Sequence, residues 1–188
     1  IGDLYNDFQT HRDGRHLMKT MMANYILEGI YFYSGFMFFY NLGRMGKMPG
    51  SVQEIRYINR DENTNLWLFR SMILELQKEE PQLFTEELIE EYKDMLRHGV
   101  EEEIRWGGYV IGNHIEGLTM EMVSDYIHYL GNLRSNSLGF GSLYDGFENE
   151  PKSMEWVSMY ANANLIKTDF FEARSSAYAK SSALVDDL

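Results

Sequence analysis

The sequence contains no cysteine, and this absence removes several kinds of chemistry. Disulfide bonds, thiol catalysis and thiolate metal sites are all excluded. A metal site in this chain would have to use carboxylate, imidazole or amide side chains, and these donors favour hard or intermediate ions such as iron or manganese. Proline is scarce too, with only three in 188 residues, which leaves room for long helices.

Basic residues are also few, because 17 Lys and Arg stand against 29 Asp and Glu and the net charge is −12. Nucleic-acid binding needs a basic face, so this balance argues against it. No cluster of Lys and Arg indicates binding to an anionic membrane surface either. We therefore expect a partner that is neither nucleic acid nor membrane.

No apolar run reaches the ~20 residues that a membrane-spanning helix needs. The most apolar stretch, Tyr25 to Tyr40, is shorter than that and contains one carboxylate, Glu28. The sequence shows no signal peptide. Its first residue is Ile1 rather than Met, which fits a chain that starts inside something larger. We expect a soluble, cytoplasmic protein.

The residues that are abundant predict an all-α fold. Leu, Met, Glu, Tyr and Ile recur without long Val/Thr alternation. A chain of 188 residues is long enough for one domain with a real core. Stop and start signals at Gly43, Pro81, Thr85 and Thr119 predict four helices, at 15–42, 51–78, 85–111 and 119–139. The third is expected to allow a break at Gly107-Gly108.

The other segments are expected to be irregular. Residues 1–14 form the end of a preceding helix and a loop, and 140–160 form a loop around Trp156. Residues 161–188 show no periodicity that would place them in a core, so we expect a flexible tail. Residues 1–160 are therefore one helical unit without an internal domain boundary.

Two further features are expected to be structural. The run E-E-E at 101–103 is typical of a solvated helix face. Trp106 and Trp156 are expected to act as packing anchors.

Glu28 is the most informative residue of the first predicted helix, because it is a carboxylate in an apolar stretch. An ionised carboxylate in an apolar interior must be neutralised, paired or bound to a metal. Four-helix carboxylate proteins build dinuclear metal sites from one Glu on each of two helices and a Glu-x-x-His pair on each of the other two. Glu28, followed by Glu62-x-x-Asn65 on the next predicted helix, offers half of this pattern.

A different explanation stays open at this point. Glu28 could pair with Arg60 or Arg70, and Asp61 and Glu62 could lie on a solvated helix face. None of the five histidines follows a Glu by three residues, so the other half of the pattern is not found elsewhere in the chain.

Longer stretches resemble a known family, the small, radical-generating subunit of class I ribonucleotide reductase, in its C-terminal half. The resemblance rests first on L-E-G-I-Y-F-Y-S-G-F and I-N-R-D-E-N-T-N-L-W. The region after the family's second metal-binding pair is similar to R-W-G-G-Y-V-I-G followed by G-L-T-M-E-M-V-S-D-Y-I-H-Y-L-G-N-L-R. The final V-D-D-L resembles the family's C-terminal peptide, so the likeness covers almost the whole chain in the right order.

The resemblance implies a ferritin-like helical bundle, of which this chain is the C-terminal half. It implies a di-iron or manganese/iron centre that reacts with oxygen and makes a stable oxidant, usually a tyrosyl radical. That oxidant passes to a large subunit, which reduces ribonucleotides to the deoxyribonucleotides of DNA replication. The implied partners are the large subunit, an N-terminal part of the small subunit and a second small subunit.

The resemblance also assigns metal ligands and a pocket. Glu28 matches the single-Glu ligand, and Glu62 and Asn65 match the second ligand pair. The apolar pocket around the radical tyrosine is matched by Phe32, Phe36 and Ile58, of which the two phenylalanines follow Glu28 by one and two helical turns on one face.

Further residues match the route by which the oxidant leaves the site. Asp61 matches a carboxylate that links a ligand to the electron-transfer route, and Tyr178 matches a redox tyrosine of the tail. Docking to the large subunit is assigned to the last four residues, Val185, Asp186, Asp187 and Leu188.

Two departures from the family pattern limit what this chain does alone. Position 65 is Asn where the family has His, and an amide lacks the imidazole nitrogen that suits iron. The first carboxylate, the first Glu-x-x-His, the radical tyrosine and the Trp of the transfer route are absent. We expect a separate N-terminal part of the small subunit to complete the centre. The alternative is a metal-free, catalytically inactive relative that binds and regulates the large subunit through its tail.

Overall fold

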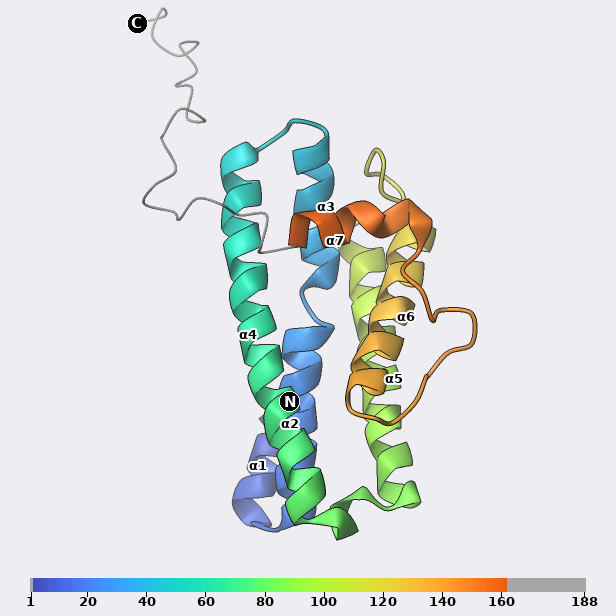
Figure 1. Ribbon diagram of the computed structural model, residues 1–188. Coiled ribbons are helices and arrows are strands. Elements are labelled where there is room, and N and C mark those ends of the chain that lie inside the picture. Colours follow the sequence, from blue (N-terminus) through green and yellow to red (C-terminus); the bar gives the residue numbers. More distant parts are fainter. Residues whose placement is uncertain (1, 162–188) are drawn as a thin grey trace, which may run out of the picture.

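The computed structural model describes residues 2–161, and the regular elements of this segment are all helical (Figure 1). An isolated bridge between Ile115 and Leu118 is the β pairing found within it. The all-α prediction is confirmed. The elements are α1 (Gly2–Thr10), α2 (Gly14–Gly29), α3 (Tyr33–Arg44), α4 (Pro49–Glu79), η1 (Pro81–Phe84), α5 (Glu86–Val110), α6 (Met120–Ser137), η2 (Lys152–Met154) and α7 (Glu155–Ala161).

Three of the four predicted helices are confirmed, as α4, α5 and α6. Thr85 and Thr119 are the N-caps of α5 and α6, and each hydroxyl accepts a hydrogen bond from the amide three residues later. Such caps satisfy backbone groups that the first helical turn leaves free. The expected break at Gly107-Gly108 is wrong, because α5 continues through both glycines.

The prediction of one helix over residues 15–42 is wrong. The segment contains two helices, α2 and α3, separated by Ile30, Tyr31 and Phe32. Phe32 has a φ of 76°, in the left-handed region that side chains other than Gly rarely adopt. The segment is mostly apolar, but Gly29 and Gly35 flank the break and glycine is unfavourable inside a helix.

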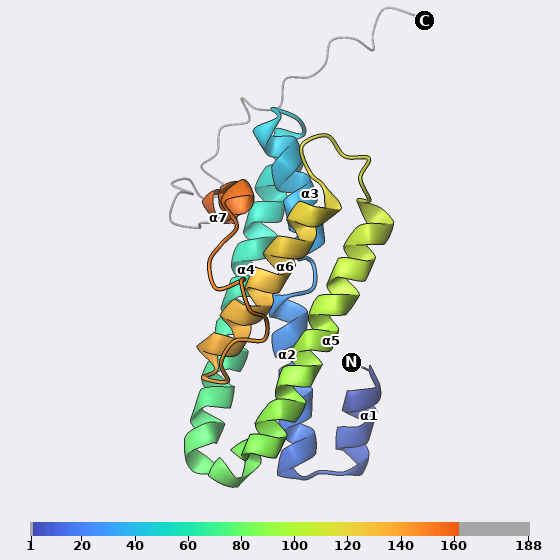
Figure 2. The same ribbon diagram turned by 90° about the vertical axis from the view of Figure 1, so that its right-hand side faces the viewer.

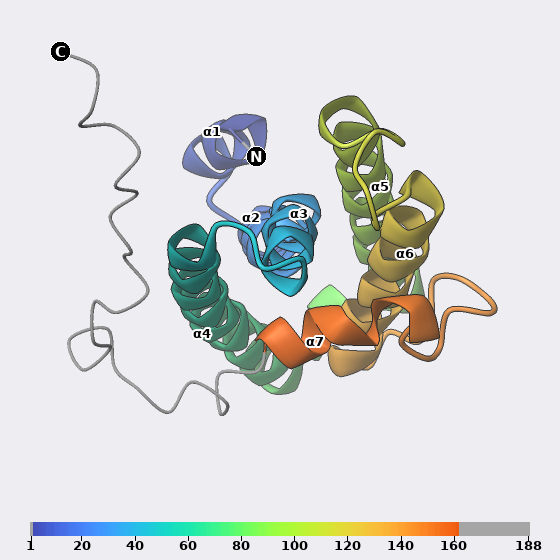
Figure 3. The same cartoon turned by 90° about the horizontal axis from the view of Figure 1, so that it is seen from above.

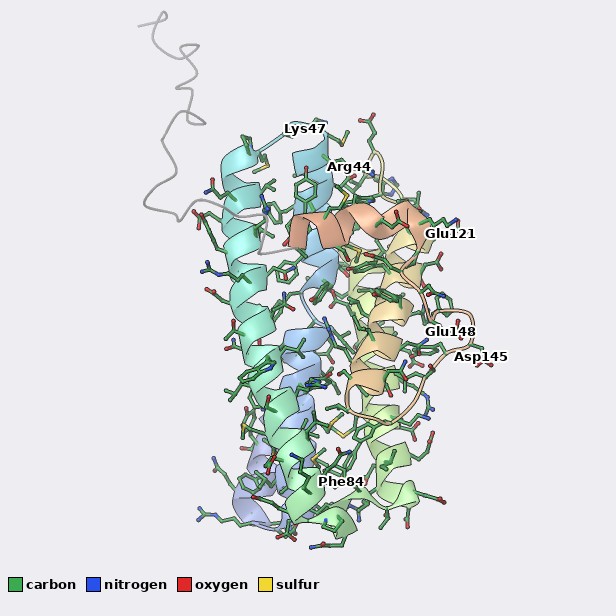
Figure 4. All side chains as sticks on the ribbon, in the orientation of Figure 1. Arg44, Lys47, Phe84, Glu121, Asp145 and Glu148 are labelled. Carbon is green, nitrogen blue, oxygen red and sulfur yellow. The ribbon has the colours of Figure 1, made fainter. Side chains whose placement is uncertain are left out.

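The predicted loop over residues 140–160 ends in a helix that the sequence did not indicate. Trp156 lies on α7, and the Arg44 guanidinium stacks over its ring at 4.4 Å from the centroid. Arg44 lies at one end of the bundle and Phe84 at the opposite end (Figure 4). The cation–π contact therefore helps hold α7 across the end of α3.

The helices are arranged in three layers. Seen from above, α2 and α3 lie between α4 on one side and the α5–α6 pair on the other, with α1 outside α2 (Figure 3). Helices α2 and α3 follow one another along the bundle, and α7 crosses the α3 end (Figure 2). This arrangement brings side chains from α2, α3, α4 and α5 to one region.

The helices pack closely where glycine permits it. A Cβ at Gly99 of α5 would lie 2.5 Å from Ile26 Cγ2 of α2, so only glycine fits at this contact. Between residues 2 and 161, none of the helices combines the length and the apolar character needed to cross a membrane. The predicted tail lies outside the described residues from position 162 onward.

Candidate functional site

The carboxylates of Glu28 and Glu62 come together from two helices. Glu28 lies in the last turn of α2, and Glu62 lies near the middle of α4, which packs along α2. Burial and the neighbouring Glu62 carboxylate raise the pKa of Glu28 to about 7, while the Asn65 amide acts in the opposite direction. Asn65 Nδ2 donates a hydrogen bond to Glu62 Oε2 at 3.3 Å. The three residues assigned to the metal site are therefore neighbours.

The ion-pair explanation of Glu28 is not supported by its surroundings. Glu28 Oε2 is buried and has no hydrogen-bond partner. Arg60 pairs instead with Asp61 at 3.2 Å, and Arg70 donates to the Ser137 carbonyl at 3.1 Å. A buried carboxylate oxygen without a cationic partner is stabilised by a proton or by a bound cation.

A cavity of about 730 Å³ has Glu62 in its wall and opens between α3, α4 and α5. Phe32, Phe36 and Ile58, the residues predicted for the apolar pocket, all line it. Phe36 is buried, whereas Phe32 is 47% exposed and Ile58 is 45% exposed. The remaining lining residues are Tyr31, Gly35, Phe39, Ile55, Glu102, Glu103 and Trp106. The cavity is thus walled mainly by apolar side chains, and its radical-pocket role stays a prediction.

The predicted single helix face from Glu28 through Phe32 to Phe36 is wrong. The break between α2 and α3 falls between Glu28 and Phe36, and Glu28 is not among the residues that line the cavity. The two phenylalanines reach the cavity because the chain breaks after α2 and a new helix, α3, begins at Tyr33.

Glu103 is a functional candidate that sequence reasoning missed. The expectation of a solvated face at residues 101–103 is wrong at this position, because Glu103 is only 3% exposed. Its Oε1 accepts the amide of Ser34 at 2.8 Å. Burial raises the pKa of Glu103, and hydrogen bonding from the backbone of Ser34 and Phe32 opposes the rise.

A periodic signal for Glu103 was present in the sequence. Leu96, Val100, Glu103 and Gly107 are all buried on α5, and their spacing of three or four residues follows one helix face. The run of three glutamates concealed this pattern, because only its last member lies on the buried face.

Asp61 is the residue assigned to electron transfer that lies within the described part of the chain. Asp61 is exposed on α4 and pairs with its neighbour Arg60. Tyr178 and the final V-D-D-L lie outside the described residues. Trp106 is 55% exposed at the cavity rim and contacts the Tyr109 ring at 5.8 Å, so it is not a buried packing anchor.

The donor set fits part of a metal site. Two carboxylates and one amide meet, and oxygen donors of this kind suit manganese and iron. The unpartnered Oε2 of Glu28 is a free donor in this set. Within residues 2–161, no group of three or more His, Cys, Asp or Glu side chains is placed to hold a metal ion. Further ligands from outside these residues are needed for a complete site.

Comparison with known proteins identifies the family. The family model of the ribonucleotide reductase small chain matches residues 1–151. Ribonucleoside-diphosphate reductase subunit beta of Treponema pallidum is 69% identical over 100% of this chain, and that of Halalkalibacterium halodurans is 39% identical over 97%. The solved R2 subunit of ribonucleotide reductase from Clostridium botulinum superposes on 85% of the chain with a TM-score of 0.80 and 47% identity. This chain covers 54%, 52% and 50% of these proteins, so it spans about half of their length.

Proposed function

The chain belongs to the ribonucleotide reductase small-chain family, and from this premise we propose that it is the C-terminal part of a radical-generating small subunit. In this proposal the small subunit supplies the oxidant with which a large subunit reduces ribonucleotides to deoxyribonucleotides. The observation that carries the proposal is the meeting of Glu28 and Glu62, with Glu28 Oε2 buried and unpartnered. Two carboxylates brought together in this way are a typical half of a dimetal site.

Glu28, Glu62 and Asn65 would hold a di-iron or manganese/iron centre together with ligands from outside this chain. When bound, that centre reacts with oxygen and supplies the oxidising equivalent, which the family usually stores as a tyrosyl radical. Glu28 would have to lose its proton to become a ligand, so binding is coupled to deprotonation. Asn65 would turn its amide oxygen toward the metal and give a weaker donor than imidazole.

The other assigned residues would act around that centre. Phe32, Phe36 and Ile58 would keep water away from the oxidant, because apolar walls exclude solvent. Asp61 would link a metal ligand to the transfer route, and Tyr178 would carry the oxidising equivalent toward the large subunit.

The cavity face is the surface to which we assign the N-terminal part of the small subunit. Phe32, Ile58 and Trp106 line the cavity and are 47%, 45% and 55% exposed. Large apolar side chains exposed together mark an interaction surface. The half of the relatives' length that this chain does not cover is the proposed occupant, and it would bring the missing carboxylates and histidine to Glu28 and Glu62.

Measurement of bound metal tests the proposed function. The 188-residue chain is combined with the part of the Treponema pallidum relative that it does not cover, then loaded with iron or manganese and desalted. We expect about two ions per complex, with strong loss in Glu28→Gln and Glu62→Gln. Glu54→Gln, on the exposed side of α4, is the matched control and should keep the metal. A complex that forms and holds no metal at stoichiometric levels contradicts the proposal.

Asn65 favours a second candidate function, a metal-free relative that regulates the large subunit. The two functions differ in their response to Asn65→His. If a metal site exists, the added imidazole should raise manganese or iron affinity by about tenfold, a typical effect of changes at a metal site. Asn63→His, two residues away on α4, is the control that should change nothing. If Asn65→His also leaves the metal content unchanged, the result supports the regulatory function and contradicts the catalytic one.

A further inference from the structure

The break between α2 and α3 exchanges one hydrogen-bond acceptor for another. In an unbroken helix the Ser34 amide would donate to the carbonyl of Ile30, four residues earlier. Here it donates to Glu103 Oε1 at 2.8 Å. Regular α3 bonding begins with the Phe36 amide, which donates to the Phe32 carbonyl at 2.9 Å. Glu103 on α5 therefore replaces the acceptor that the break removes.

Two residues of α5, Glu103 and Gly107, make contacts that depend on the break between α2 and α3. Glu103 is 3% exposed, so a straight helix would leave its carboxylate buried without the Ser34 amide. Ser34 Oγ also donates to the Glu103 carbonyl at 3.4 Å. One turn later, a Cβ at Gly107 would lie 2.9 Å from Ser34 Oγ, so the glycine allows this close approach.

The break carries backbone strain that needs support from outside the segment. Phe32 has a φ of 76°, which is costly for a residue with a Cβ. Such a conformation persists where the surroundings over-determine it. The contact with Glu103 is one polar interaction that supports the break. Arg134 of α6 provides another, because its guanidinium donates to the Gly29 carbonyl at 2.9 Å and to the Tyr33 hydroxyl at 3.0 Å.

We propose that Glu103 is a positioning residue. Its carboxylate stabilises the break between α2 and α3 and thereby sets the positions of Phe32 and Phe36 in the cavity wall relative to Glu28. Helices α3, α4 and α5 meet at this cavity, because Glu62 of α4 and Glu103 of α5 line it together with the two phenylalanines. The consequence for a metal centre rests on the proposed function, whereas the control of the break does not.

Nuclear magnetic resonance of the full 188-residue chain tests the inference without any metal. Glu103→Leu removes the acceptor while keeping bulk, and the Cα chemical shifts of Ile30, Tyr31 and Phe32 should move to helical values. Glu103→Gln keeps one acceptor oxygen, so the break should remain while hydrogen exchange at the Ser34 amide rises about threefold or more, because a carboxamide accepts through one oxygen where a carboxylate accepts through two. Glu102→Gln, at the neighbouring cavity position, should change neither readout.

Shifts at residues 30–32 that stay as in the wild type in Glu103→Leu overturn the inference. If that variant does not fold, Glu103→Gln decides, and unchanged exchange at Ser34 then overturns it. In the assembled two-part complex, Glu103→Leu should also weaken Mn²⁺ binding by about tenfold, and Glu103→Gln should largely restore it. Changed shifts with unchanged Mn²⁺ affinity support control of the break and count against its link to the proposed metal site.

Discussion

At the scale of single residues, Glu28 sets how the metal-free chain responds to pH. Burial and the Glu62 carboxylate raise its pKa from 4.5 to about 7, so the folded state holds this proton more tightly than the unfolded state. The resulting stability is fully present below about pH 4.5 and is lost as the pH rises through about 7. We expect Glu28→Gln to be more stable than the wild type at pH 8, by about 1 kcal/mol, and to show little difference near pH 4.5.

Urea unfolding of both proteins in EDTA, at pH 4.5 and pH 8, measures this effect. Glu54→Gln serves as the control, because it removes an exposed carboxylate from α4 and should show no such pH dependence. A stability difference between Glu28→Gln and wild type that is the same at both pH values would mean that Glu28 is not the group responsible.

The proximity of Glu28, Glu62 and Asn65 could be predicted from the sequence because each carries a local signal. A carboxylate in an apolar run and a Glu-x-x-Asn spacing are visible without a structure. The Ser34 contact of Glu103 could not be found in this way, because the two residues lie 69 positions apart. Glu103 accepts the free amide at the start of α3 only because α3 packs on α5.

At the scale of helices, α2 and α5 are held together by a contact that only glycine allows. A Cβ at Gly99 would lie 2.5 Å from Ile26 Cγ2. We expect Gly99→Ala to destabilise the chain by about 1–3 kcal/mol, because the overpacked contact must shift. This loss should exceed the gain of about 1 kcal/mol that alanine brings to a helix interior.

Gly108→Ala on the same helix is the matched control for this contact. Its nearest neighbour would be Met120 Cε at 3.9 Å, which is ordinary contact, and the position is exposed. The substitution should therefore stabilise the chain by up to about 1 kcal/mol. Thermal or urea unfolding of the two variants should give opposite signs, and stabilisation by both substitutions would show that the α2–α5 contact is not tight.

Helix ends with local signals were predictable, and the break was not. Thr85 and Thr119 mark the starts of α5 and α6 by their own side chains. The break after Gly29 has a weaker mark, because Gly29 and Gly35 disfavour a helix interior but no side chain in the segment caps a helix end. Helix α7 was missed for a related reason, because it is short and is held by the contact of Trp156 with Arg44.

At the scale of the whole molecule, residues 2–161 combine a packed interior with an open apolar face at the cavity. The core extends through all the long helices, yet Phe32, Ile58 and Trp106 stay partly exposed at the cavity. An apolar face of this kind, in a chain that spans about half of its relatives' length, is what a partner segment would cover. Glu62, one of the proposed metal ligands, lines this cavity. In the proposed function, docking and metal binding would therefore occur together.

The last prediction concerns the C-terminal residues, which are assigned to the large subunit. Removing Val185–Leu188 should abolish binding to the large subunit and leave the unfolding midpoint of the helical bundle unchanged. The reason is that a short peptide with two carboxylates and two apolar side chains can dock through charge and anchor residues together. Isothermal titration calorimetry measures the effect, with the ribonucleotide reductase large subunit taken from the organism of one of the relatives.

A free peptide ending in V-D-D-L should compete with the chain for the large subunit, and the scrambled ending D-V-L-D should not. Asp186→Asn with Asp187→Asn should weaken binding and reduce its dependence on salt, because the two charges are removed. A truncated chain that binds as tightly as the intact one would move the docking surface to residues 1–184. Because both the catalytic and the regulatory function require docking, this experiment tests the partner independently of the metal. Loss of docking with metal binding intact would therefore separate the two halves of the proposed function.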